Sequence, residues 1–423
     1  MNFDVLIIGA GPAGLHAAHV AAEAGVRVGI VDDNALPGGQ IWRQGPLHHA
    51  TGRARELIDA IGTRRNVTML NGTRIVQALP ERRLLAQSAE SALVIGYEKL
   101  IVASGARERF LPFPGWTLAG VTGAGGLQAL VKSGTPVSGE RIVIAGSGPL
   151  LFAAAITARA HGAKIVAIVE QAPARAVRRF AAGLVHTPAK LAQALRMRFD
   201  LRATPYWCDA YVTEAIGETG VTQVRIQHSD TIRLVDCDRL ACAYGLVPNT
   251  QIGAALGCEV ETSAGAQALA VNEWQQTSCD AIYAAGECTG VGGMELAAVE
   301  GRVAAWAALG NHEAARALFG ERERYRRFAA RLHEAFALSP ALRTLAQPDT
   351  IFCRCEDVPF RDVARYPSWR EAKLQTRCGM GPCQGKICGE AAAFCFGWAQ
   401  NTQRPPFSPA RIGTLLHSAH TPR

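Results

Sequence analysis

The chain has 423 residues, of which 48% are hydrophobic and 19% charged, and it carries a formal net charge of +8. This length allows two or three domains with separate cores, and the hydrophobic share is ordinary for a packed α/β protein. The positive charge is diffuse. Its one dense cluster, the arginines within 322–331, alternates with acids and is expected on a solvated or subunit-facing helix, so no nucleic-acid binding is expected.

The apolar segments and the cysteines indicate the compartment. No signal peptide and no apolar run long enough to cross a bilayer is recognisable, so a cytoplasmic protein is expected, with peripheral membrane contact left open. All twelve cysteines lie at or after Cys208, and six of them lie between Cys353 and Cys395. A secreted disulfide framework would not leave half of the chain without cysteine. The sequence therefore indicates reduced thiols with one local metal or cluster site.

The first 32 residues carry the pattern of a dinucleotide-binding βαβ unit. An apolar, β-branched run leads into Gly-x-Gly-x-x-Gly, an alanine-rich helical stretch and a second short strand that ends on acids. The glycines allow a tight turn, close approach of the backbone to a pyrophosphate and close helix packing, and the acid can accept ribose hydroxyls. The residues predicted to bind the dinucleotide are Gly9, Gly11, Pro12, Ala13, Gly14, Asp32 and Asp33.

Three later segments favour FAD as this dinucleotide. The Pro-Gly-Gly-Gln turn at 37–40 can lie against a flavin, although alone it is typical of a surface turn. The strand ending near 103 runs into small residues, and a Gly-Glu pair follows the strand at 281–285, where flavoproteins of this type usually have Gly-Asp. A simple helix cap is the alternative for that acid, and the helix beginning near 293 would direct its positive end at the flavin. The predicted contacts are Gly39, Gln40, Ser104, Gly105, Gly286, Glu287, Gly293 and Met294.

Residues 141–170 repeat the opening βαβ pattern, which indicates a second nucleotide fold inserted in the first. This copy has Leu151 in the place of the third glycine, which would force the helix away from the strand. Glu170, at the end of its second strand, would favour NAD over NADP. The sequence leaves three alternatives open: NAD, another adenine nucleotide, or a fold retained without a ligand.

A cysteine-rich segment begins near residue 352. Four thiolates from two tight loops are what a [2Fe–2S] cluster or a zinc ion needs. Five cysteines compete for four places, and Cys383 and Cys388 are preferred to Cys378 because a Gly-Met-Gly-Pro turn and a Gln-Gly pair place them on one loop. The spacing differs from that of zinc ribbons, so an iron–sulfur cluster is preferred to zinc or no metal. The predicted ligands are Cys353, Cys355, Cys383 and Cys388.

Over nearly its full length the chain resembles a family of FAD-containing α subunits from multi-subunit dye-linked dehydrogenases for amines and imino acids. This family includes opine oxidase A subunits, hydrogen cyanide synthase B subunits and hydroxyproline/proline dehydrogenase α subunits. The resemblance rests on the glycine patterns at 9–14 and 146–151, on the turn at 37–41, and on the Cys-Arg-Cys-Glu and Gly-Met-Gly-Pro-Cys-Gln-Gly-Lys runs. The last two resemble the [2Fe–2S] domain of bacterioferritin-associated ferredoxin (BFD). Glu287 in place of Asp is the main departure.

The resemblance implies an α/β fold with two dinucleotide-binding domains, like that of glutathione and thioredoxin reductases, and a small helical BFD-like domain. The expected parts are a discontinuous FAD domain at 1–115 and 246–310, a second nucleotide-type domain at 116–245, a helical connector at 311–348, and the BFD-like domain with its tail at 349–423.

The resemblance also implies an electron-transferring subunit without catalytic residues of its own. A partner β subunit of the glycine-oxidase or sarcosine-oxidase type would oxidise an amine, imino acid or opine, and a small ferredoxin-like subunit is a further candidate partner. The absence of a Cys-x-x-Cys pair near either βαβ unit argues against a disulfide reductase. The alternative is a stand-alone NADH-dependent FAD oxidoreductase that passes electrons to its own cluster.

Overall fold

The structure is a computed structural model that describes residues 1–46, 48–263, 265–398 and 404–419. The last four residues of the expected tail, 420–423, lie outside this description. The chain divides into two compact units. Unit 1 comprises 1–107, 247–330 and 402–423, and unit 2 comprises 108–246 and 331–401. The strands β7 (Ala106–Glu108) and β16 (Leu246–Pro248) lie where the chain passes between them.

Unit 1 is built on a seven-stranded sheet in the order β3-β2-β1-β6-β5-β4, with β19 also paired to β6. The strands β1, β2, β3, β6 and β19 are parallel, and β4 and β5 add an antiparallel hairpin. The long strand β6 pairs with β5 through its first half and with β19 through its last residues. The strands are β1 (Asn2–Ile8), β2 (Val28–Asp32), β3 (Val67–Asn71), β4 (Arg74–Leu79), β5 (Arg83–Gln87), β6 (Ala92–Val102) and β19 (Ile282–Ala284), with a separate pair β17 (Val260–Ser263) and β18 (Ala266–Leu269).

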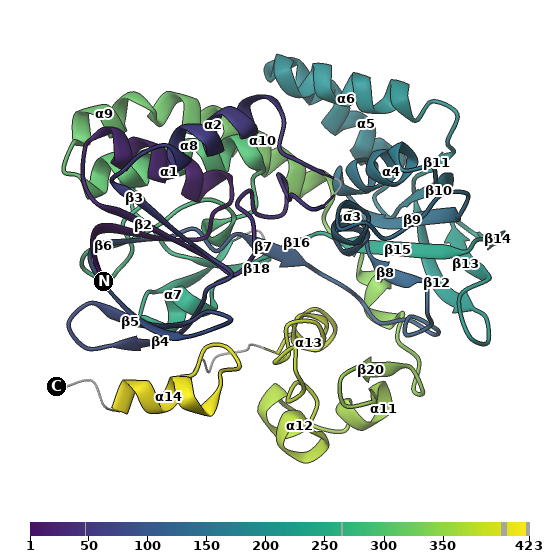
Figure 1. Cartoon of the computed structure of the whole chain (residues 1–423). Helices are drawn as coiled ribbons and strands as arrows, with labels where there is room; N and C mark the ends of the chain where they lie inside the picture. The colour runs from purple at the N-terminus through teal and green to yellow at the C-terminus, as the bar shows by residue number, and fades with distance from the viewer. Residues whose placement is uncertain (47, 264, 399–403, 420–423) are drawn as a thin grey trace. The chain divides into compact units, whose positions relative to one another are not determined.

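Helices cover both faces of this sheet, with α1, α2, α8 and α9 on one face and α7 on the other (Figure 1). Alanines and glycines let α1 and α8 approach closely, because a Cβ at Gly301 of α8 would lie 2.1 Å from the carbonyl oxygen of Ala13 in α1. The helices are α1 (Pro12–Glu23), α2 (Gly52–Gly62), α7 (Gln251–Ala255), α8 (Met294–Ala308), α9 (His312–Ala317), α14 (Ile412–Ala419), the 3-10 turn η2 (Glu287–Thr289) and α10 (Phe319–Ala335), whose last residues belong to unit 2.

Unit 2 contains a five-stranded parallel sheet in the order β11-β10-β9-β15-β8 and a three-stranded antiparallel sheet β12-β13-β14. One apolar cluster joins residues of the parallel sheet to α3 and α4, and a second joins it to β12 and β13. The strands are β8 (Val121–Gly123), β9 (Arg141–Ser147), β10 (Lys164–Glu170), β11 (Tyr206–Trp207), β12 (Ala210–Ile216), β13 (Gln223–His228), β14 (Thr231–Asp236) and β15 (Arg239–Tyr244). The helices are α3 (Ala124–Lys132), α4 (Leu150–Ala160), α5 (Ala174–Gly183), η1 (Leu184–His186) and α6 (Pro188–Asp200).

The cysteine-rich segment, which also belongs to unit 2, has a small core of its own. It follows η3 (Pro340–Thr344) and consists of a short strand pair and three helices: β20 (Ile351–Cys353), β21 (Val358–Pro359), α11 (Phe360–Val363), α12 (Trp369–Thr376) and α13 (Cys388–Phe396). Among the described helices of the whole chain, none has the length and apolar character needed to cross a membrane.

Candidate cofactor sites

The glycine-rich turn between β1 and α1 is shaped by close backbone packing. A Cβ at Gly9, whose φ is +108°, would lie 2.3 Å from the carbonyl oxygen of Ala103, and a Cβ at Gly14 would lie 1.8 Å from that of Gly9. Side chains are therefore excluded at both positions. At the middle glycine, Gly11, the one described atom within 4 Å of the Cβ position, apart from its chain neighbours, is the Cα of Gly39 at 3.9 Å. This space beside Gly11 fits the close approach of a pyrophosphate.

The two acids after β2 lie in different surroundings. Asp32 is buried, and its carboxylate accepts hydrogen bonds from the backbone nitrogen of Ala10 at 2.6 Å and from that of Asn34 at 2.7 Å. Asp33 is exposed and pairs with Arg74 at 3.0 Å. Asp32 thus stabilises the glycine-rich turn through hydrogen bonds, whereas Asp33 makes a surface ion pair.

The small residues after β6 are fixed by a return of the chain. The hydroxyl of Ser104 donates to the carbonyl oxygen of Asn249 at 2.7 Å, and the side-chain amide of Asn249 donates to the Ser104 carbonyl at 3.0 Å. Gly105 adopts a φ of +66° at this bend. Gln40, in the expected flavin-facing turn, is exposed.

The second predicted flavin motif follows β19. A Cβ at Gly286 would lie 2.8 Å from the Cβ of Ala13, so Gly286 packs directly on the first turn of α1. Glu287 is half-buried, and desolvation raises its pKa to about 7 in spite of a hydrogen bond from the Gly293 backbone. This contact gives Glu287 a role at the start of α8. Met294, the first residue of α8, lines a cavity of about 640 Å³ within unit 1.

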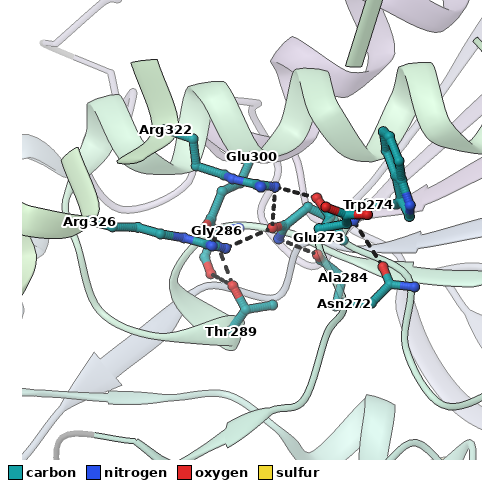
Figure 2. Close-up of polar contacts among 10 residues, drawn as sticks. Asn272, Glu273, Trp274, Ala284, Gly286, Thr289, Glu300, Arg322 and Arg326 are labelled. Atoms are coloured by element: carbon teal, nitrogen blue, oxygen red, sulfur yellow. Dashed lines mark hydrogen bonds and ion pairs between the residues drawn. The ribbon is translucent and has the colours of Figure 1, made fainter. Parts of the chain in front are cut away.

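A buried acid on α8, which was not predicted from the sequence, supports this motif. Figure 2 shows Glu300, Thr289 and Arg326 gathered at Gly286. The Glu300 carboxylate accepts hydrogen bonds from the Gly286 nitrogen at 3.1 Å, from the Thr289 hydroxyl at 3.2 Å and from the Arg326 guanidinium at 3.3 Å. Burial raises the pKa of Glu300, and Arg326 opposes that shift. The only signal in the sequence is an acid within an alanine-rich helix.

The arginine cluster of α10 takes part in the same network. Arg322 is buried and donates to the Glu273 carbonyl at 2.6 Å and to the Gln275 side chain at 3.3 Å. Gln275, fully buried, donates in turn to the Ala284 carbonyl at the end of β19. The expectation of a solvated or subunit-facing surface is therefore wrong for Arg322, because its charge is satisfied inside unit 1 by acceptors around the second motif.

In the cysteine-rich segment, the four predicted ligands line one cavity of about 220 Å³. The other residues lining this cavity, mostly apolar, include Phe110, Trp116 and Phe352. The indole nitrogen of Trp116 donates a hydrogen bond to the Ile351 carbonyl, beside the first cysteine loop. Four thiols around one small, largely apolar space match the donor set of a [2Fe–2S] cluster.

The fifth cysteine, Cys378, does not line this cavity but lies close to two of the cysteines that do. The sulfur atoms of Cys353, Cys378 and Cys388 lie within 4.8 Å of one another, and all three side chains are buried. Hydrogen bonds from Cys378 and Cys388 hold the pKa of Cys353 far below that of a free thiol. Cavity and triad thus share Cys353 and Cys388. The cavity adds Cys355 and Cys383, whereas the triad adds Cys378, so Cys378 remains a competitor for one ligand place.

Comparison with protein families places the chain among oxidoreductases. Residues 3–305 match the model of the pyridine nucleotide-disulphide oxidoreductase family. Membership of this family implies FAD as the cofactor. The chain is 32% identical to hydrogen cyanide synthase subunit HcnB of Pseudomonas aeruginosa (strain PAO1), over 92% of this chain and 91% of that protein. It is 30% identical to the opine oxidase A subunit of Rhizobium meliloti (strain 1021), over 98% of each chain.

Solved structures show the same fold. The L-proline dehydrogenase from P. horikoshii superimposes with a TM-score of 0.67 at 17% identity, covering 98% of this chain and 79% of that one. Thioredoxin reductase from T. acidophilum superimposes with a TM-score of 0.53 at 21% identity, covering 76% and 98%. The expected fold with two dinucleotide-binding domains is confirmed. The chain belongs to the pyridine nucleotide-disulphide oxidoreductase family of flavin oxidoreductases, together with HcnB of hydrogen cyanide synthase and the opine oxidase A subunit.

Proposed function

We propose that this chain is the electron-transferring subunit of a heteromeric dye-linked dehydrogenase or oxidase, and that it holds FAD and a [2Fe–2S] cluster. A partner flavoprotein subunit oxidises an amine, imino acid or opine. The observation that carries the proposal is the presence, in one chain, of a flavoprotein fold and a cavity lined by four thiols.

The relatives support a role within a larger assembly. HcnB is named as a subunit of hydrogen cyanide synthase, and the opine oxidase relative is likewise named as one subunit of its enzyme. The opine oxidase match covers 98% of each chain, so it includes the cysteine-rich segment. The partner flavoprotein and its substrate are part of the proposal.

In unit 1, the turn at Gly11 would hold the pyrophosphate of FAD, Asp32 would hold its ribose, and Gly286 and Met294 would contact its flavin. The N-terminal end of α8 would then stabilise negative charge on the flavin. In the cysteine-rich segment, Cys353, Cys355, Cys383 and Cys388 would hold the cluster. When bound, FAD and the cluster together supply two-electron and one-electron transfer.

A disulfide-reductase function is not favoured, although the family is named for it. Such a reductase needs two neighbouring thiols beside the flavin, and the first cysteine of this chain is Cys208. The next cysteine is Cys237, and the sequence contains no Cys-x-x-Cys pair. Electrons are therefore expected to leave by the C-terminal cysteines.

The proposal is tested on protein purified anaerobically, alone and co-expressed with its partner flavoprotein. Iron, acid-labile sulfide and FAD are measured, and the complex is assayed with amines, imino acids and opines and an artificial dye. We expect two irons and two sulfides per FAD and substrate-dependent dye reduction by the complex only. Cys353→Ser should lose the iron, whereas Cys395→Ser, which changes a thiol of the same segment that does not line the cavity, should retain it. Stoichiometric zinc in place of iron would contradict the proposal.

A further inference from the structure

The second nucleotide fold is covered by another part of the same chain. After α10 the backbone continues as Phe336–Ser339, here called the strap, and it lies on the turn between β9 and α4. In a dinucleotide-binding fold this turn and the helix that follows it receive the pyrophosphate. The turn and the strap both belong to unit 2.

The strap contacts the turn at its two central residues. The Ser147 hydroxyl donates to the Phe336 carbonyl at 3.0 Å. The ring of Phe336 lies over Gly148, with its Cγ 3.8 Å from the Cβ position of that glycine. The same ring packs edge-on against Phe180, at 5.3 Å between centroids. The space that a second glycine leaves for a phosphate is thus taken by an aromatic side chain.

Gln171, the residue after β10, fixes the strap from the other side. Its side-chain nitrogen donates to the Ser147 hydroxyl at 2.9 Å and to the Ala337 carbonyl at 3.1 Å. Its side-chain oxygen accepts from the Ser339 nitrogen at 2.9 Å. Gln171 is buried, so these bonds are shielded from water. Beyond Ser339, Leu342 of η3 enters the apolar core of unit 2 and anchors the strap further.

Glu170, the acid of the second nucleotide fold, is also hydrogen-bonded by its own turn. The Glu170 carboxylate, which is fully buried, accepts from the Gly148 nitrogen at 2.7 Å and from the Ala172 nitrogen at 2.9 Å. Asp32 makes similar bonds in the first fold, so the acid alone does not distinguish the two folds. The two folds differ in the residue that lies against the middle glycine of the turn. Gly11 faces a glycine, and Gly148 faces a phenylalanine ring.

We infer that the strap, Phe336–Ser339, occupies the pyrophosphate position of the second nucleotide fold and thereby excludes NADH as an electron donor to this chain. This inference rests on the proposed function, because it restricts the source of electrons to a partner protein. A dinucleotide would have to break the three strap bonds of Ser147 and Gln171. At about fivefold in the equilibrium constant for each bond, these three bonds alone weaken dinucleotide binding by about a hundredfold, and the Phe336 ring over Gly148 must be displaced as well.

The test uses the full FAD-loaded chain under anaerobic conditions. NAD⁺ binding is measured by calorimetry, and flavin absorbance is followed after NADH is added. For the wild type we expect no saturable binding up to on the order of 1 mM and no bleaching of the flavin. Saturable binding, or bleaching by NADH, would overturn the inference without any result from the partner flavoprotein.

Two variants identify the cause of the exclusion. The double variant Gln171→Ala/Phe336→Ala opens the strap, and we expect NAD⁺ to bind at least about tenfold more tightly, since two of the strap bonds and the covering ring are lost. Leu151→Gly restores the third glycine but leaves the strap in place, so it should not bind NAD⁺. Binding by Leu151→Gly, or its absence in a folded double variant, would refute the role of the strap. Iron and dye assays on the same preparations report on the proposed function separately.

Discussion

Glu300 offers the sharpest test of how unit 1 holds its second flavin motif. Substituting Glu300→Ala removes the acceptor of the Gly286 N–H, the Thr289 O–H and the Arg326 guanidinium. The three losses differ in weight. The Gly286 N–H is buried and is left without its acceptor, which costs about 1–3 kcal/mol. The Thr289 hydroxyl keeps a second acceptor, the Gly286 carbonyl at 2.9 Å, so its loss is small.

The ion pair itself contributes little to this estimate. The Glu300 side chain is 4% exposed, but that of Arg326 is 38% exposed, so solvent screens the pair and its guanidinium can turn to water. Removal of the buried side-chain carbons adds about 1 kcal/mol. The total for Glu300→Ala is therefore about 2–4 kcal/mol, whereas Arg326→Ala should cost about 1 kcal/mol or less.

Thermal unfolding of the FAD-loaded chain measures this difference. For a unit of this size, about 2–4 kcal/mol corresponds to a fall in midpoint of about 4–16 °C. The matched control is Arg324→Ala, an exposed arginine on α10, the helix of Arg326, and it should shift the midpoint by less than about 2 °C. FAD retained through gel filtration is measured in parallel, and we expect Glu300→Ala to lose more of it than the control. An unfolding midpoint and FAD content equal to those of Arg324→Ala would refute the reasoning.

Three further predictions concern other parts of the sites. Gly39→Ala should weaken FAD binding, because Gly39 has a φ of +61° and an added Cβ would lie 2.9 Å from the Cα of Gly11. Flavin fluorescence on release measures the affinity, and an unchanged affinity would contradict this prediction. Cys383→Ser should lose iron and the cluster spectrum, whereas Cys378→Ser should keep both; the reverse pattern would make Cys378 the ligand. Glu170 has a pKa of about 7 because of burial, above that of the unfolded chain, so its protonated form favours folding. The stability of the wild type relative to Glu170→Gln should therefore fall by up to about 3 kcal/mol as pH rises from about 4.5 to about 7, and a rise over that range in denaturant unfolding would refute this.

The two βαβ units could be predicted because each is encoded by one continuous stretch of sequence. The strands and helix at 2–32 and at 141–170 follow the predicted pattern. Glu300 could not be predicted, because its partners are a backbone nitrogen fourteen positions before it and an arginine on another helix. The spacing of the five cysteines likewise does not determine which thiols line the cavity, because that depends on how the loop at 378–388 packs against Cys353 and Cys355.

The two nucleotide folds show why a glycine pattern is necessary for a dinucleotide but does not suffice. In both folds the acid at the end of the second strand accepts a hydrogen bond from its own turn, Asp32 from the Ala10 nitrogen and Glu170 from the Gly148 nitrogen. The motif residues therefore stabilise the turn whether or not a ligand is present. What differs is the segment that covers the turn, and the covering strap comes from 189 positions away in the sequence. Retention of a fold and retention of its ligand are thus separable, because the first depends on the motif and the second on whatever else the chain places above it.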